Sequence, residues 1–259
     1  MRDPYAMLPG NGPVVATAVH GGHDLREEVR RQLILDEETR LLEEDPYTEL
    51  LAAGADSVVS VYRSRFEVDL NRPREKAVYR TPEDAWGLQL WDGPQEETLV
   101  EGSLRIYDDF YRDLEALLES LLLRFPKVVL LDLHSYCHRR DGPTAVAADP
   151  AANPEVNLGT GSLPTAPWRA LVERFKAELG SPDPSGRQLL VGENVRFRGG
   201  HLSQRIHTAF PGRVCVLAIE FKKFFMDEWT GRLDTAEFAR AGAALRATLP
   251  GLREELEKL

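Results

Sequence analysis

The sequence VVATAV at residues 14–19 runs directly into HGGH at residues 20–23. A second stretch repeats this arrangement, since VVLL at residues 128–131 runs into DLHSY at residues 132–136. Short apolar runs bounded by polar residues and glycines are typical of buried strands. Because the carboxyl ends of adjacent parallel strands meet at one edge of a sheet, we expect the histidines of the two stretches to converge there.

Strand and helix patterns alternate along the rest of the chain. Apolar residues recur at helical spacing in 99–125, and a third buried-strand pattern covers 214–219 and ends at Glu220. Further strands are expected at 57–62, 67–70, 145–148 and 189–191, and further helices at 24–44, 164–179 and 236–259. The polar stretch 73–97 is expected to form a long functional loop. This order predicts one α/β domain over residues 1–259, with three layers (α/β/α) and a mixed, largely parallel sheet.

The composition argues against several classes of protein. A chain of 259 residues with 42% hydrophobic residues is long enough for one large domain with a substantial core. Its formal net charge of −10 argues against a general nucleic-acid or membrane binder and favours a small-molecule or peptide substrate. Cys137 and Cys215 are too few for a disulfide framework. Residues 1–12 lack a secretory pattern and no apolar run approaches roughly 18 residues, so we expect a cytoplasmic protein.

The histidines at the two strand ends predict a zinc site. A catalytic zinc ion takes three protein ligands and keeps one position open, and neutral imidazole suits it well. His20, His23 and His134 would supply that set. Gly21-Gly22 allows the sharp backbone turn that His20 and His23 need to face one point, because glycine accepts conformations closed to other residues.

The third ligand has alternatives. Asp24 or Glu27 could replace His23, since Glu27 would share a face with His23 on a helix that begins near Asp24. Asp132 precedes His134 by two residues, hence lies on the same side of the strand, and could orient the imidazole. The simplest alternative is that each histidine is a polar loop residue and binds no metal.

Glu220 is the candidate general base, because it ends the third apolar run. A carboxylate beside an activated water can take its proton and pass it to the leaving amine. The alternative is that Glu220 pairs with Lys222, Lys223 or a nearby arginine.

Basic side chains are expected to bind an acidic substrate. Arg72, with Asn71 beside it, follows the 67–70 strand pattern, and an arginine there can hold a carboxylate through two parallel hydrogen bonds or polarise a carbonyl. More positive charge surrounds Gly199-Gly200, although a solvated loop would look similar. The residues concerned are Arg196, Arg198, His201 and Arg205, of which His201 and Arg205 are predicted to bind substrate.

These motifs, in this order, resemble the N-formylglutamate amidohydrolase family, itself similar to the zinc carboxypeptidases. The resemblance runs from residue 14 to about residue 230 and rests on HGGH (20–23), DLNR (69–72), DLHSY (132–136), GG (199–200), IE (219–220) and FMDE (225–228). It implies a fold like that of the zinc exopeptidases. It also implies zinc-dependent hydrolysis of a C–N amide bond in an N-acyl acidic amino acid such as N-formylglutamate.

The resemblance also implies roles for single residues. His20 and His134 match zinc-ligand positions, and Glu220 matches the catalytic glutamate. Asn71-Arg72 match the pair that binds the substrate carboxylate and polarises the carbonyl. His23 stands where the zinc carboxypeptidases carry a ligating glutamate, and residues 201–205 replace a tyrosine-containing pattern.

Other functions fit the same residues. One is a carboxypeptidase or polyglutamate-type hydrolase that uses the same metal on a short peptide. Another is a metal-bearing binding protein without hydrolytic activity, and a structural protein without metal is the last. No nucleic-acid or membrane partner is expected.

Overall fold

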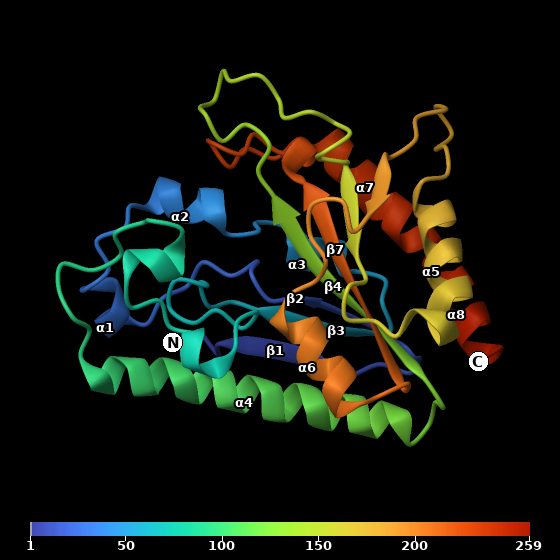
Figure 1. Cartoon of the computed structure of the whole chain (residues 1–259), viewed down its shortest axis with the longest axis horizontal. Coiled ribbons are helices and arrows are strands. Elements are labelled where there is room, and N and C mark those ends of the chain that lie inside the picture. Colours follow the sequence, from blue (N-terminus) through green and yellow to red (C-terminus); the bar gives the residue numbers. More distant parts are fainter. Residues whose placement is uncertain (1) are drawn as a thin grey trace.

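The computed structural model describes residues 2–259, apart from the side chain of Thr165, and is built around one seven-stranded sheet (Figure 1). The strands are β1 (Tyr5–Leu8), β2 (Val14–Ala18), β3 (Ser57–Val61), β4 (Val128–Tyr136), β5 (Val156–Gly159), β6 (Val191–Glu193) and β7 (Val214–Lys222). Their order across the sheet is β1-β3-β2-β4-β7-β5-β6. β1 runs antiparallel to β3 and β5 antiparallel to β7, whereas the other neighbouring pairs are parallel. The predicted α/β class with a mixed, largely parallel sheet is confirmed.

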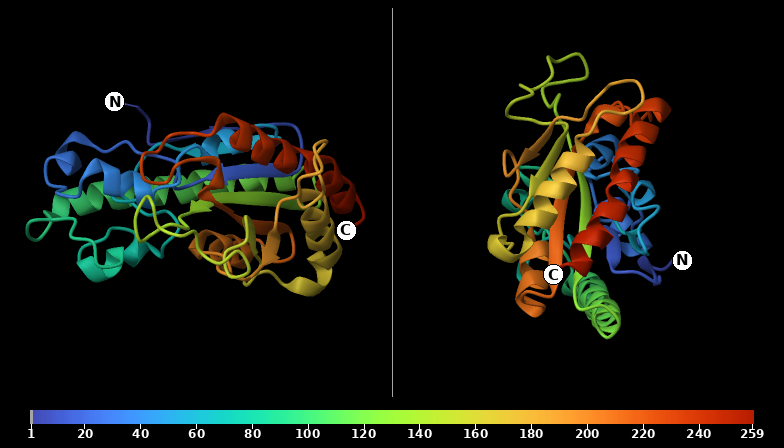
Figure 2. Two further views of the ribbon diagram at one scale, coloured as in Figure 1. Left: turned by 90° about the horizontal axis from the view of Figure 1, so that it is seen from above. Right: turned by 90° about the vertical axis from the view of Figure 1, so that its right-hand side faces the viewer.

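Helices cover both faces of this sheet. They are α1 (Glu27–Arg30), α2 (Glu37–Glu43), α3 (Thr48–Leu51), α4 (Glu97–Leu122), α5 (Thr165–Leu179), α6 (His201–Ala209), α7 (Thr235–Ala247) and α8 (Leu249–Glu257). One core cluster joins the sheet to α3, α5, α7 and α8, and a second joins it to α4 and α6, which gives the expected three layers (Figure 2). In the described part of the chain, no helix combines the length and apolar character needed to cross a membrane.

The central strands send alternate side chains into the two cores. In β4, Leu131 and Leu133 belong to the core with α5, α7 and α8, whereas Val128 and Leu130 belong to the core with α4 and α6. Because side chains alternate along a strand, His134 shares the face of Leu130. The register of β4 and β7 places Glu220 beside His134, at the carboxyl ends of both strands.

Several expected elements are wrong in detail. The single helix expected at 24–44 is two short helices, α1 and α2, and no strand forms at 67–70 or 145–148. The helix expected at 236–259 is α7 and α8, which meet at Thr248, and Pro250 lies in the first turn of α8. Proline lacks a backbone N–H and suits a helix start better than a helix interior, which explains the break.

The 73–97 stretch forms the expected long loop, with only two 3-10 turns in it, Arg74–Lys76 and Pro82–Ala85. Buried Tyr79 and Trp91 anchor it in a small third apolar cluster. Trp86 differs from both, because its side chain is 51% exposed and its backbone adopts a positive φ of 55°.

Candidate active site

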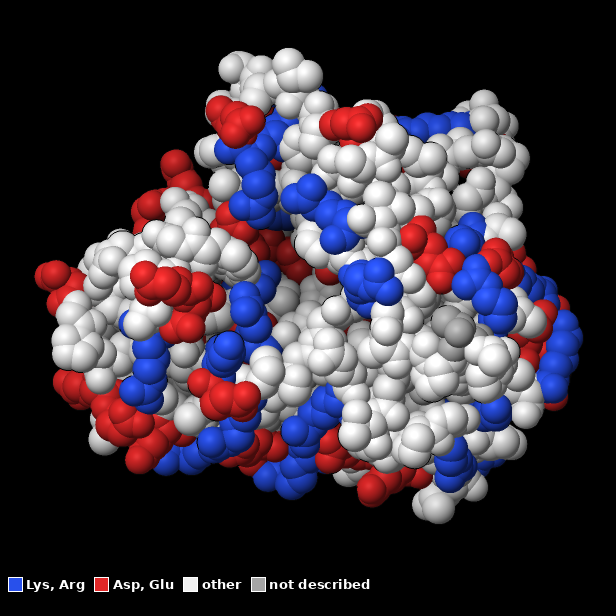
Figure 3. Space-filling model, viewed as in Figure 1, with Lys and Arg blue, Asp and Glu red and all other residues white. Residues whose placement is uncertain are grey.

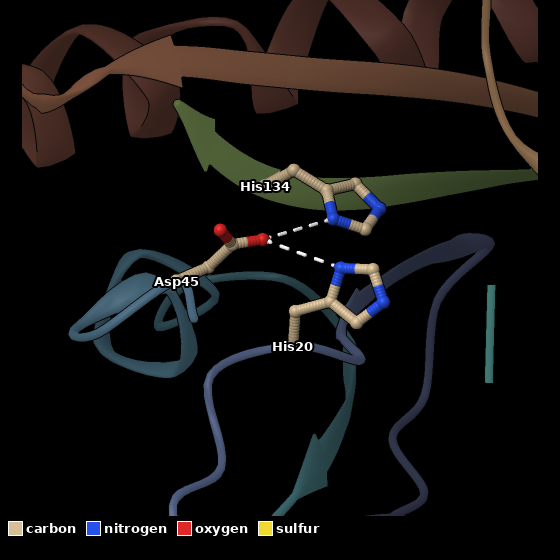
Figure 4. Close-up of side chains that lie close together, drawn as sticks. All are labelled: His20, Asp45 and His134. Atoms are coloured by element: carbon tan, nitrogen blue, oxygen red, sulfur yellow. Dashed lines mark hydrogen bonds and ion pairs between the residues drawn. The ribbon is translucent and has the colours of Figure 1, made fainter. Parts of the chain in front are cut away.

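His20, Asp45 and His134 converge where β2 and β4 end (Figure 4). His20 follows β2, His134 lies near the end of β4, and Asp45 follows α2. Asp45 Oδ2 lies 3.1 Å from His134 Nδ1 and 3.5 Å from His20 Nδ1. All three residues are buried, and their potential ligand atoms lie within 4.8 Å of one another. This spacing allows the three residues to share one metal ion.

The hydrogen bonds of His20 fit a metal ligand. His20 Nε2 lies 2.7 Å from Asp69 Oδ1, so we assign the ring proton to Nε2. In the neutral imidazole, the lone pair of Nδ1 then faces the Asp45 carboxylate with no proton between them. Two facing acceptors are unfavourable in a buried site, and a cation between them would satisfy both. A carboxylate on the outer nitrogen is also the usual partner of a metal-bound imidazole.

His134 can complete the same set. Its Nε2 lies 3.1 Å from Asp132 Oδ1, and neither oxygen of the buried Asp132 carboxylate has a hydrogen-bond partner of good geometry among residues 2–259. Asp132 is therefore available to hold the ring proton at Nε2 when Nδ1 binds a metal ion. Two imidazoles and one carboxylate are a known ligand set of catalytic zinc sites, so the residues present fit a zinc ion.

Without a metal, the cluster is held together by charge. Burial lowers the pKa of His134, but Asp132 and Asp45 outweigh it and bring that pKa well above its usual range. Burial alone would raise the pKa of Asp45, yet the His134 and His20 imidazoles, in their doubly protonated forms, hold that pKa well below its usual range through hydrogen bonds and positive charge. A cation bound here would take over the role of these protons.

Glu220 lies beside this cluster with a free carboxylate. No hydrogen bond or ion pair joins its side chain to any other residue that the structure describes. Its two lysine neighbours are occupied elsewhere, because Lys222 Nζ donates to Asn153 O and Lys223 Nζ donates to the carbonyls of Leu42 and Glu44. Pairing of Glu220 with these lysines, the alternative drawn from the sequence, is therefore wrong. Burial raises the pKa of Glu220 to about 7.

A cavity of about 300 Å³ opens over the cluster. Figure 3 shows a hollow on this face, with acidic residues in its depth and basic residues along its sides. The lining includes His20, Asp45, His134 and Glu220. It also includes four basic residues, Arg65, Arg140, Arg196 and Lys223, and three aromatic ones, Trp86, Tyr136 and Phe197. Such a cavity suits a small, negatively charged ligand.

Arg196 differs from the other cavity-lining arginines. Arg65 donates to Asp69, and Arg140 pairs with Glu43. Arg196 donates to the amide oxygen of Asn153 and has no carboxylate partner among residues 2–259. Arg196 is exposed, and its guanidinium can therefore bind a carboxylate of the ligand without breaking an ion pair.

Comparison with known proteins agrees with this site. The family model described as N-formylglutamate amidohydrolase matches residues 12–226, a range that contains all four residues at the base of the cavity. The chain belongs to the N-formylglutamate amidohydrolase family. The resemblance read from the motifs is thereby confirmed, and family membership indicates that the chain is an amidohydrolase.

Two solved structures share the fold. N-formylglutamate amidohydrolase from Ralstonia eutropha JMP134 superposes with a TM-score of 0.76 at 17% identity, over 98% of each chain. The gene product Atu2144 from Agrobacterium tumefaciens gives a TM-score of 0.65 at 17% identity, over 99% of this chain and 94% of the other. At this identity both comparisons bear on the fold alone. No curated protein sequence matches this chain.

In this family member, the structure does not bring His23 to the cluster. The chain after His20 runs close against the end of β3, where a Cβ atom on Gly22 would lie 2.3 Å from the carbonyl carbon of Tyr62. His23 then faces α2, with Nδ1 2.5 Å from Glu44 Oε2 and Nε2 3.3 Å from Glu37 Oε1. The prediction that His23 converges with His20 and His134 is therefore wrong, and Asp45 lies where His23 was expected.

The alternative ligands also lie elsewhere. Glu27 accepts a hydrogen bond from Arg31 on the surface of α1, and Asp24 pairs through its backbone with the chain beyond β3. Neither belongs to the group of described residues that could hold a metal ion. The reason is that residues 24–44 do not form one helix, so the expected face of His23 and Glu27 does not exist.

Of the predicted substrate residues, Asn71 alone lines the cavity. Its Nδ2 lies 3.3 Å from His134 Nε2, and its Oδ1 accepts the Leu202 N–H at 2.9 Å. Gly200 allows this contact, since a Cβ atom there would lie 2.3 Å from Asn71 Oδ1. Arg72 lies at the rim, 3.8 Å from Asp69 Oδ2 and 5.7 Å from the ring of Trp86.

His201 and Arg205 point away from the cavity toward α4. His201 Nε2 lies 3.0 Å from Tyr107 Oη, and Arg205 donates to Glu115 at 2.9 Å. Their direction follows from α6, a helix that the sequence pattern did not predict. Residues four apart on a helix share a face, and here that face packs beside α4. The prediction that these two side chains contact substrate is thus not supported by their placement.

Asp45 was missed in the sequence. Its only signal was Asp45-Pro46 at the end of a charged segment, which indicates a helix end rather than a ligand. Its burial and its approach to His134 arise from packing between segments 89 residues apart. Nothing in the local pattern distinguishes it from Glu43 or Glu44.

Proposed function

We propose that this protein hydrolyses the amide bond of an N-acyl acidic amino acid, such as N-formylglutamate, with a zinc ion held by His20, Asp45 and His134. One observation carries the proposal: the three potential ligands converge beside Glu220, whose carboxylate has no partner in the described chain. We further propose that the whole chain forms one hydrolase domain. The cytoplasmic location expected from the sequence stays a prediction.

The chemistry divides between the ion and the side chains. Bound zinc would polarise the substrate carbonyl and make water acidic enough to lose a proton near neutral pH. Glu220 would take that proton and deliver it to the nitrogen of the leaving amine, so that water and amide become a carboxylate and an amine. Asp69 and Asp132 would keep the imidazoles oriented through their Nε2 atoms.

The basic lining is proposed to select acidic substrates. Arg196 would bind a substrate carboxylate, and the amide of Asn71 would donate to the carbonyl oxygen as negative charge develops on it. Arg72 would add positive charge from the rim, beside Trp86. A cavity of about 300 Å³ is at the small end of ligand pockets, which favours a single acylated amino acid over a longer peptide.

The test is to supply the zinc-loaded protein with N-formyl-L-glutamate and to measure formate and glutamate together. Equal release of both products supports the proposal, and a matched assay on N-formyl-leucine should show much weaker turnover because Arg196 has no second carboxylate to bind. Release of glutamate from γ-linked diglutamate, with no formate released from N-formyl-L-glutamate, would instead support the peptide hydrolase. Bound zinc with no turnover of either substrate would support a binding protein.

A further inference from the structure

The second histidine of the HGGH motif holds a buried carboxylate rather than a metal. Glu44 has a side chain only 1% exposed, and its Oε2 lies 2.5 Å from His23 Nδ1. Its other oxygen, Oε1, accepts hydrogen bonds from Ser64 Oγ and, at 3.4 Å, from Arg40. Arg40 also donates to the backbone carbonyl of His23 at 2.5 Å. Three segments of the chain therefore meet at Glu44.

Glu44 directly precedes Asp45, so this cluster acts on the backbone of a proposed ligand. Glu44 ends α2 in an extended conformation, and the Asp45 N–H donates to His20 O at 2.9 Å. On the other side, the buried Lys223 Nζ lies 2.7 Å from Glu44 O. The Asp45 carboxylate is thereby aimed at the imidazoles from a backbone that hydrogen bonds hold on both sides.

This support is needed because α2 is short. A helix of seven residues is marginal by itself and does not fix the residue that follows it. Hydrogen bonds between charged groups in buried sites are strong and directional, so the Glu44 cluster can supply the missing rigidity. A buried carboxylate that loses one such partner moves toward another one or toward water.

We propose that His23 is a positioning residue, which acts through Glu44 to hold Asp45 at metal-binding distance from His20 and His134. The proposal rests on the proposed function, since it assumes that these three residues bind zinc. His23 itself stays outside the ligand set, because Nδ1 is occupied by Glu44 and Nε2 faces Glu37 near the surface, where the His23 side chain is 33% exposed.

The experiment measures zinc affinity of the folded protein by competition with a coloured chelator, together with the visible spectrum of the cobalt-substituted protein. His23→Ala should weaken zinc binding about 10-fold or more and change the cobalt spectrum, as loss of outer partners of metal ligands does. His23→Asn should restore affinity to within about threefold, because its amide can donate from near the Nδ1 position.

Glu37→Gln is the matched control, since Glu37 contacts the same imidazole from its exposed side with a side chain that is 75% exposed. It should leave affinity and spectrum unchanged. Thermal unfolding of the metal-free variants shows whether each one folds. If His23→Ala does not fold, Ser64→Ala removes another Glu44 donor and should weaken zinc binding in the same direction.

Three outcomes overturn the inference, and they differ from one another. Unchanged zinc affinity and cobalt spectrum in His23→Ala or Ser64→Ala, even with a lower unfolding temperature, would reduce the cluster to a structural role. Equal loss of zinc binding in His23→Ala and His23→Asn would show that the hydrogen bond to Glu44 is not what holds Asp45 in place. Failure of the wild type to bind zinc would remove the proposed function itself, and this inference with it.

Discussion

Replacement of Glu220 by glutamine should greatly reduce turnover and stabilise the metal-free protein at the same time. Glutamine has nearly the same size and shape as glutamate but cannot accept a proton. The side chain makes no hydrogen bond or ion pair with the described residues, so the substitution breaks no contact in the folded chain. Loss of a general base lowers kcat by about 10²–10⁴-fold. Zinc content should stay unchanged, because Glu220 is not one of the three proposed ligands.

The stability gain follows from burial. The pKa of the Glu220 carboxyl rises from 4.5 to about 7 in the folded, metal-free protein. A rise of that size corresponds to a cost of about 3 kcal/mol for holding the ionised form at alkaline pH. Because part of the side chain reaches the cavity, solvent screening reduces the expected gain to about 1–3 kcal/mol.

The sign of the pH dependence is fixed by the same shift. Between pH 4.5 and about 7, the unfolded chain has released the Glu220 proton while the folded chain still holds it, so the wild type loses stability as pH rises through this range. Glutamine does not titrate. The variant should therefore match the wild type below pH 4.5 and exceed it above about pH 7.

Urea denaturation of chelator-treated wild type and variant, at about pH 5 and about pH 8, measures the difference. Turnover of N-formylglutamate and zinc content are measured on the same preparations. A variant that is less stable at about pH 8 would show that Glu220 makes stabilising contacts that the structure lacks. Turnover at the wild-type rate would remove Glu220 from the reaction.

Three further predictions concern other parts of the molecule. Burial lowers the pKa of His207 to about 4, so the free energy of unfolding of the wild type should fall by about 2–3 kcal/mol as pH drops from 6.5 to about 4. In urea denaturation, His207→Gln should show a weaker dependence of stability on pH. Arg196→Gln should raise KM for N-formylglutamate about 10–100-fold with kcat nearly unchanged, and a fall in kcat with constant KM would contradict its binding role. Asp69→Asn should weaken zinc binding about 10–100-fold in calorimetric titration, and an unchanged affinity would show that Asp69 does not support His20.

Much of the fold could be predicted because its central strands are continuous apolar runs. β2, β4 and β7 are buried on both faces, so their sequences stand out, and each ends within two residues of a residue that lines the cavity. This is why the sequence predicts His20, His134 and Glu220 as site residues, and why the apolar runs alone are enough to expect their convergence.

The rest depends on contacts between distant segments. His23 lies three residues after His20, which suggests a pair of ligands, but the approach of Gly22 to Tyr62 turns His23 toward Glu44 instead. Asp45 carries no local pattern, because its burial comes from packing against β2 and β4.

The helix α6 was missed for a related reason. Its sequence is mostly polar, and its two fully buried apolar residues, Leu202 and Ile206, are too few for a clear periodic pattern. Without that helix, the sequence could not show that His201 and Arg205 point toward α4.

The most direct test of the metal site is the zinc content of the purified protein, compared among wild type, His134→Ala and Asp45→Ala, with His207→Gln as a folded control. We predict about one zinc per chain in the wild type and the control, and almost none in the other two variants. Full zinc content in Asp45→Ala would contradict the ligand set, and a wild type that takes up no zinc would contradict the metal site as a whole.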